Sequence, residues 1–136
     1  MKKLTELNKK LFDSVQAGDL NLLKKLLFDG ADINSRDCDG ETILHDAAFS
    51  NDRLDIIKYL IEEKNFKINC LDNEFVTPLH EAARAGNLEF VKYLVEKGAD
   101  INKQDIEGST ALDYAIDEDR DDVIKYLELK MVPEVK

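Results

Sequence analysis

The sequence predicts an all-α solenoid, in which units of two short helices, connected by β-turn or hairpin loops, stack in a row. Internal repetition is the first observation behind this prediction. An Ile-Asn pair recurs at intervals of 35 and 33 residues, at Ile33-Asn34, Ile68-Asn69 and Ile101-Asn102, and a threonine keeps the same intervals at Thr42, Thr77 and Thr110. The second observation is an apolar stripe at helical spacing in the units. A helix pair this short cannot bury its stripe alone, so neighbouring units must stack.

Four units account for most of the 136-residue chain. We expect one domain over residues 1–130, with a C-terminal tail over 131–136. The unit boundaries fall near 1–34, 35–69, 70–102 and 103–130. The first unit lacks the leading β-turn of the others, as expected of a terminal capping unit.

The first two units are recognised by comparison with the third. Ala17-Gly18-Asp19-Leu20 matches Ala85-Gly86-Asn87-Leu88 at an offset of 68 residues, which predicts helices over 8–17 and 20–28. The second unit repeats the threonine and the apolar run, which predicts helices over 42–50 and 54–63. It carries two extra residues, which we assign to loops over 49–53 and 64–67 because loops tolerate added length.

The third unit shows most clearly the residues that begin and end its helices. The Thr77 hydroxyl is suited to cap a helix whose first position is Pro78, and Gly86 ends that helix, which predicts 77–85. An apolar stripe and a closing glycine at Gly98 predict a second helix over 88–96. The fourth unit predicts helices over 110–117 and 121–130, and Pro133 stops the last one.

The motif of the third unit is specific. It reads Thr77-Pro78-Leu79-His80-Glu81-Ala82-Ala83-Arg84-Ala85-Gly86-Asn87, followed by Lys97-Gly98-Ala99-Asp100-Ile101-Asn102. This motif resembles the ankyrin repeat, and the resemblance covers residues 5–130. The fold it implies is an ankyrin-repeat solenoid, in agreement with the prediction from periodicity and helix signals.

The resemblance also implies where a partner protein binds, namely on the projecting turns and the inner face of the first helices. Carried over by position, the candidate partner-binding residues are Asp39, Glu41, Phe49, Glu74, Phe75, Val76, Arg84, Ile106, Glu107, Asp117 and Glu118. In ankyrin-like units a histidine forms hydrogen bonds between adjacent turns. Thr42, His45, Thr77 and His80 are therefore assigned a structural role between repeats.

Phe75 departs most from its counterparts. The matching positions are Gly40 and Gly108, where a turn needs a positive φ angle, so a bulky residue there costs free energy unless the turn is remodelled. Either the third turn is irregular and Phe75 folds back onto a neighbour, or Phe75 is an exposed anchor for a partner, since aromatic residues are enriched at binding hot spots. Phe49, which replaces Arg84 and Asp117 of the later repeats, leaves the same two interpretations open.

The chain carries 19 basic and 29 acidic residues, a net charge of −10. The four segments 1–34, 35–69, 70–102 and 103–136 carry +1, −3, −3 and −5. This balance disfavours nucleic acid and anionic membrane surfaces as ligands and leaves a basic or neutral protein partner. The acidic run over 117–122 fits either a solvated helix start or contact with a basic partner.

Catalysis has no support in the sequence. His80 opens a zinc-protease-like pattern, but Arg84 stands where the second histidine is required, and the glycines punctuate repeats rather than form a phosphate loop. We therefore expect no enzyme activity, no metal and no cofactor. Cys38 and Cys70 are too few for a disulfide scaffold, and no apolar run is long enough to span a bilayer. These features predict a location in the cytoplasm, and we expect the protein to be a monomer.

Two functions fit these observations. The first is a non-catalytic protein–protein interaction module that binds its partner through the concave face. The alternative is a stand-alone acidic inhibitor or immunity protein that neutralises a basic toxin or enzyme.

Overall fold

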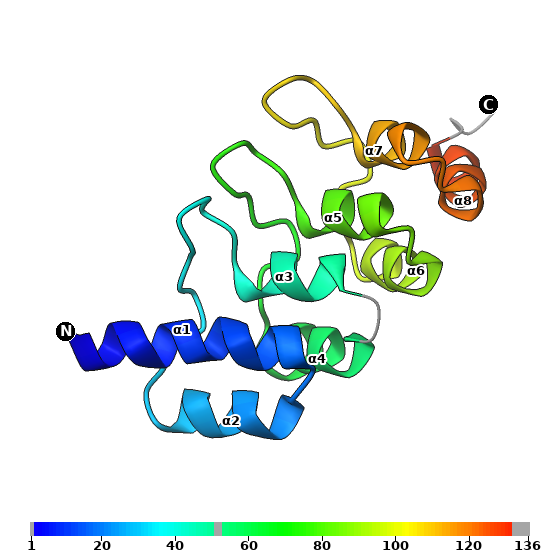
Figure 1. The fold of residues 1–136 in the computed structure, drawn as a ribbon. Coiled ribbons are helices and arrows are strands. Elements are labelled where there is room, and N and C mark those ends of the chain that lie inside the picture. Colours follow the sequence, from blue (N-terminus) through cyan, green and yellow to red (C-terminus); the bar gives the residue numbers. More distant parts are fainter. Residues whose placement is uncertain (1, 51–52, 132–136) are drawn as a thin grey trace.

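The computed structural model describes residues 2–50 and 53–131 (Figure 1). Its elements in chain order are α1 Lys2–Ala17, α2 Leu20–Phe28, α3 Ile43–Phe49, α4 Leu54–Lys58, the π-helical turn η1 Tyr59–Glu63, α5 Pro78–Ala85, α6 Leu88–Glu96, α7 Ala111–Asp117 and α8 Asp121–Met131. The described residues contain no strand. The prediction of an all-α solenoid is confirmed.

The helices form two rows (Figure 1). The inner row contains α1, α3, α5 and α7, and each of these helices packs against the next one in the row. The outer row contains α2, α4 with η1, α6 and α8. The core runs between the rows, where Leu44, Ile57, Leu79, Leu94 and Leu127 are buried. Burial is thus shared along the whole stack rather than concentrated at one centre.

Three inner helices begin with the same cap. Thr42 and Thr77 each accept a hydrogen bond from the backbone N–H of the histidine three residues later, and the Nδ1 atom of that histidine accepts one from the threonine N–H. Thr110 and Asp113 form the equivalent pair at α7. This reciprocal arrangement is a capping box, which explains why each helix begins where its threonine stands.

Three loops project from one side of the stack (Figure 1), and we call the residues at their ends, 37–41, 72–76 and 105–109, the fingers. In each finger one aspartate side chain accepts two hydrogen bonds from backbone N–H groups of its own turn. These aspartates are Asp37, Asp72 and Asp105. The fingers are also joined to one another. The Asn73 N–H donates to Asp39 O at 3.0 Å, and the Ile106 N–H donates to Glu74 O at 2.9 Å.

The helices depart most clearly from the sequence prediction at two places. Helix α1 begins at Lys2 rather than at residue 8. The second extra residue of repeat 2, which the sequence places in the loop over 64–67, is instead absorbed in the π-helical turn η1, where the Lys64 N–H reaches Tyr59 O. A π turn adds one residue to a helix and leaves the next segment in place. Consequently Phe66 is buried and bonds Leu60 O as Ala99 bonds Leu94 O.

The other predicted insertion and the tail lie partly outside the described residues. Residues 51 and 52 of the loop over 49–53 are not described, and neither are residues 132–136 of the tail. Met131, the first residue assigned to the tail, belongs to α8.

Candidate functional site

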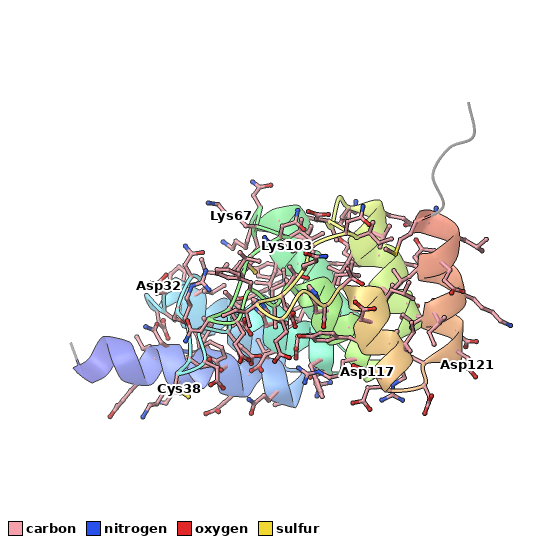
Figure 2. All side chains as sticks on the ribbon, turned by 90° about the horizontal axis from the view of Figure 1, so that it is seen from above. Asp32, Cys38, Lys67, Lys103, Asp117 and Asp121 are labelled. Carbon is pink, nitrogen blue, oxygen red and sulfur yellow. The ribbon has the colours of Figure 1, made fainter. Side chains whose placement is uncertain are left out.

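The fingers and the inner helices that come after them form one continuous surface, which we call the finger face and define as residues 37–50, 72–85 and 105–118. These segments contain 12 acidic residues and one basic residue, a charge of −11. The rest of the chain contains 17 acidic and 18 basic residues, a charge of +1. Negative charge is therefore concentrated in these segments, although two cations from outside them lie against them, Arg36 at Gly40 O and Lys103 at the Phe75 ring. In Figure 2 this face runs from Cys38 near α1 to Asp117 at the opposite end.

Phe75 keeps the backbone of a glycine. Its φ angle is +62°, close to the +77° of Gly40 and the +84° of Gly108 at the matching positions. The turn is therefore not remodelled to accommodate the larger residue, and the left-handed conformation costs about 1–2 kcal/mol for a residue with a Cβ atom. The Phe75 side chain is 49% exposed, and Lys103 Nζ lies 5.8 Å from its ring centroid.

Phe49 belongs to a cluster of rings around one guanidinium. Arg84 Cζ lies 5.4 Å from the ring centroid of Phe49 and 5.6 Å from that of Tyr114, both within cation–π range. The same guanidinium pairs with Glu81, which is only 4% exposed. Phe49 remains 45% exposed with Arg84 beside it, so part of its ring is open to a ligand.

The surroundings of several carboxyl groups of the finger face make their ionisation unfavourable. Burial, together with the negative charges of Glu81, Asp37, Asp46 and Asp72, raises the pKa of Glu41 to about 7. Burial also raises the pKa of Asp46, which accepts a hydrogen bond from Gln16 Nε2 at 3.2 Å. Burial and neighbouring negative charge therefore both oppose ionisation of these two carboxyl groups.

The two histidines connect neighbouring repeats. His45 Nε2 lies 2.7 Å from Val76 O, and His80 Nε2 lies 2.9 Å from Ser109 O. Each Nδ1 accepts from a threonine N–H, so each Nε2 carries the proton and donates it to the carbonyl. Burial lowers the pKa of both imidazoles. This arrangement leaves neither ring nitrogen available as a catalytic base.

The candidate partner-binding residues differ in exposure. Asp39, Phe49, Glu74, Phe75, Ile106, Glu107, Asp117 and Glu118 are exposed, and Glu41 and Arg84 are half-buried. The prediction that Val76 is an exposed partner-binding residue is wrong, because its side chain is only 5% exposed. The Val76 N–H donates to the Asp72 carboxylate, and Val76 O accepts from His45 Nε2. These two hydrogen bonds hold the backbone so that the side chain points inward at the base of the finger. A partner cannot contact Val76 through its side chain.

Sequence reasoning missed the residues that support this surface. Tyr114 packs edge-on against His80, with 4.7 Å between the ring centroids, and its hydroxyl donates to Asp105. Asp37, Asp72 and Asp105 hold the finger turns. These aspartates occupy the same position in their repeats. The internal repetition that located the helices could therefore also have identified the residues that hold the finger turns.

The described residues offer no sign of a metal centre. No group of three or more His, Cys, Asp or Glu side chains among them is arranged to hold a metal ion. An open groove of about 760 Å³ lies between α1 and residues 32–38 and is lined in part by Phe12, Arg36 and Cys38. None of the helices in the described part of the chain is long and apolar enough to cross a membrane.

Comparison with known proteins gives a consistent picture. A family described as ankyrin repeats (3 copies) matches residues 11–105 and 77–132. A putative ankyrin repeat protein of Rickettsia bellii is 34% identical over 119 residues, which cover 88% of this chain and 66% of the relative. Alpha-latrocrustotoxin-Lt1a of Latrodectus tredecimguttatus is 35% identical over 102 residues, and palmitoyltransferase Hip14 of Drosophila melanogaster is 38% identical over 105. These matches cover 75% and 74% of this chain but only 7% of the toxin and 16% of the transferase.

Proposed function

The chain belongs to the ankyrin-repeat family, and from this premise we propose that it is a non-catalytic protein-binding module whose partner lies against the finger face. Ankyrin repeats generally mediate protein–protein interaction. We propose that the four repeats over 1–130 act as one binding unit. We also propose that the protein acts as a monomer in the cytoplasm, a compartment suited to the free thiols of Cys38 and Cys70.

Phe75 is the observation that carries this proposal. A glycine at this position would relieve the backbone, as Gly40 and Gly108 do in the neighbouring fingers. The phenylalanine instead costs stability and leaves half of an aromatic ring in solvent. Ile106, which is 61% exposed, stands in the next finger, whose backbone is hydrogen-bonded to Glu74 beside Phe75. An apolar pair on a polar face is the kind of anchor that a partner buries.

Charge suggests what kind of protein the partner is. The finger face carries −11, so it attracts a basic surface and repels nucleic acid and anionic lipid. The partner-binding residues under this proposal are Phe75, Ile106 and Phe49 as apolar anchors, with Asp39, Glu41, Glu74, Arg84, Glu107, Asp117 and Glu118 around them.

The concentration of charge on one face also favours a second candidate function. A stand-alone acidic inhibitor that neutralises a basic toxin or enzyme would need this one-sided distribution. The two functions differ in their consequence for the partner, since an inhibitor abolishes the partner's activity and a plain binding module does not. An open reading frame for a basic protein beside the gene would favour the inhibitor.

An affinity pull-down followed by mass spectrometry tests the proposed function. We would compare the native chain with Phe75→Gly and with Leu129→Ala, a control that removes an exposed apolar side chain from the outer helix α8. A partner that is captured by the native chain and by the control, and lost with Phe75→Gly, supports the proposal. Retention of the same partners by Phe75→Gly would show that the finger face is not where they bind.

A further inference from the structure

Repeats 2 and 3 share an acidic position on their inner helices, but only repeat 3 supplies a cation for it. Asp46 on α3 and Glu81 on α5 are 35 residues apart and stand at the same repeat position. Glu81 is paired with Arg84, three residues later on the same helix. The residue three positions after Asp46 is Phe49. The second repeat therefore lacks the internal cation of the third.

No other cation of the described residues takes its place. The ion pairs within 4.0 Å among these residues are Lys25–Asp29 and Arg84–Glu81. The Arg36 guanidinium donates to the carbonyl oxygens of Gly40 and Leu71 instead. The hydrogen-bond partner of the Asp46 carboxylate is the neutral amide of Gln16. Glu41, half-buried in the preceding finger, adds a second negative charge near Asp46 when it is ionised.

Arg84 shows which kind of chemical group this surface binds well. Its guanidinium lies against the Phe49 ring on one side and the Tyr114 ring on the other, and it also pairs with a carboxylate. Planar guanidinium groups suit such sites because they stack on rings and bond carboxylates at the same time. At Asp46 a carboxylate and the partly exposed Phe49 ring are both present. Arg84 lies against one part of that ring but pairs with Glu81, and no guanidinium of the described residues forms an ion pair with Asp46.

We propose that Asp46 and Phe49 of α3, together with Glu41 of the preceding finger, dock an arginine side chain carried by a basic segment of the partner protein. This inference rests on the proposed function and names the chemistry of the partner. The arginine pairs with the Asp46 and Glu41 carboxylates and lies over the part of the Phe49 ring that Arg84 leaves exposed. The charge of −11 on the finger face directs a basic segment to this position.

A display library of random linear peptides, selected on the immobilised full chain, provides the probe. Peptides that require Phe75, tested with Phe75→Gly, would be synthesised with and without each of their arginines. Their dissociation constants would be measured for the native chain, for Asp46→Asn and for Glu89→Gln, which removes an exposed charge from the outer helix α6. Thermal melts would check that each variant is folded.

The expected result is a double-mutant cycle in which one arginine and Asp46 are coupled. Replacing that arginine weakens binding to the native chain and to Glu89→Gln by at least about fivefold, but weakens binding to Asp46→Asn by less than about twofold. Arginine effects of equal size in all three proteins would overturn the inference, as would selected peptides without arginine, and both results leave the proposed function standing. A selection that yields no Phe75-dependent peptide would count against the proposed function and the inference together.

Discussion

The Nε2–H of His45 donates to the carbonyl oxygen of Val76, in the next repeat, at 2.7 Å. The same ring accepts the Thr42 N–H through Nδ1, so one buried side chain caps its own helix and holds the following finger. We expect His45→Ala to lower the free energy of unfolding by about 2–4 kcal/mol, because two buried backbone groups lose their partner and a cavity remains. Urea unfolding measures this loss, and a loss below about 0.5 kcal/mol would contradict the assigned role.

The same histidines predict a dependence of stability on pH. Burial lowers the pKa of His45 and His80 below the ordinary 6.5, so the unfolded chain binds protons more readily than the folded chain. Their contribution to stability is complete above pH 6.5 and is lost as the pH falls through that value toward the lowered pKa. The stability difference between the native chain and His45→Ala should therefore be smaller at pH 5 than at pH 8. An unchanged difference would contradict the neutral state of His45.

Glu41 gives the opposite pH dependence. Its pKa is raised to about 7 from an ordinary value of 4.5, so its protonated form favours the folded state below pH 4.5 and this contribution is lost as the pH rises through 7. We expect Glu41→Gln to be more stable than the native chain at pH 8 by about 1 kcal/mol, after allowance for solvent screening. At pH 4 the two should be equal in urea unfolding. If Glu41→Gln were less stable than the native chain at pH 8, the negative charge of Glu41 would have to be compensated by a neighbouring group.

Variants at Phe75 and at Gly108 give two separate measurements of the free-energy cost of a positive φ angle in the finger turn. Phe75→Gly should raise the free energy of unfolding by up to about 1 kcal/mol, since the relief of strain exceeds the added freedom of the unfolded chain. Gly108→Ala should lower it by about 1 kcal/mol through φ alone, because an added Cβ meets no atom within 4 Å. Loss of stability in Phe75→Gly would mean that the Phe75 ring contributes packing.

Gly40 is constrained by the next finger as well as by its φ angle. A Cβ atom there would lie 2.2 Å from Asn73 Oδ1 and 2.9 Å from the Asn73 backbone nitrogen. Since Asn73 N–H donates to Asp39 O, Gly40→Ala should displace the finger contact and cost more than Gly108→Ala, about 2–3 kcal/mol. Chemical denaturation of the two variants side by side tests this order. Equal losses would show that Asn73 moves aside freely.

Salt should affect association with a basic partner more than dissociation. The negative charge of the finger face raises the rate of encounter, and salt screens this attraction over a distance of about 10 Å at 0.1 M. We expect the association rate constant to fall by about tenfold between low and physiological salt, with a smaller change in the dissociation rate constant. Stopped-flow measurements with the partner would test this. An association rate that does not respond to salt would rule out steering.

The sequence predicted the elements that every repeat must share. Stacking forces equivalent residues into equivalent contacts, so Thr42 and Thr77 could be recognised as helix starts from their period alone. The same comparison exposed Phe75 as the residue that departs from glycine. What it could not show is how side chains turn at the base of a finger, which is why the prediction that Val76 lies on the surface is wrong.

Charge is the clearest example of what required the structure. Divided by repeat, the net charge grows toward the C-terminus. Repeats 2, 3 and 4, however, each contribute one finger and one inner helix to the same surface, so a division of the charge by repeat mixes the two faces. The contact of Arg84 with Phe49 joins matching positions of adjacent repeats, whereas its contact with Tyr114 joins different positions and leaves no periodic signal.

The hydrogen bonds that join the fingers have a consequence for binding thermodynamics. Because Asn73 bonds Asp39 and Ile106 bonds Glu74, the turns that carry the apolar anchors are already ordered in the free protein. A partner would therefore immobilise few loop residues, and the association would lose little conformational entropy. Differences in affinity among related partners should then arise mainly from how long each complex persists.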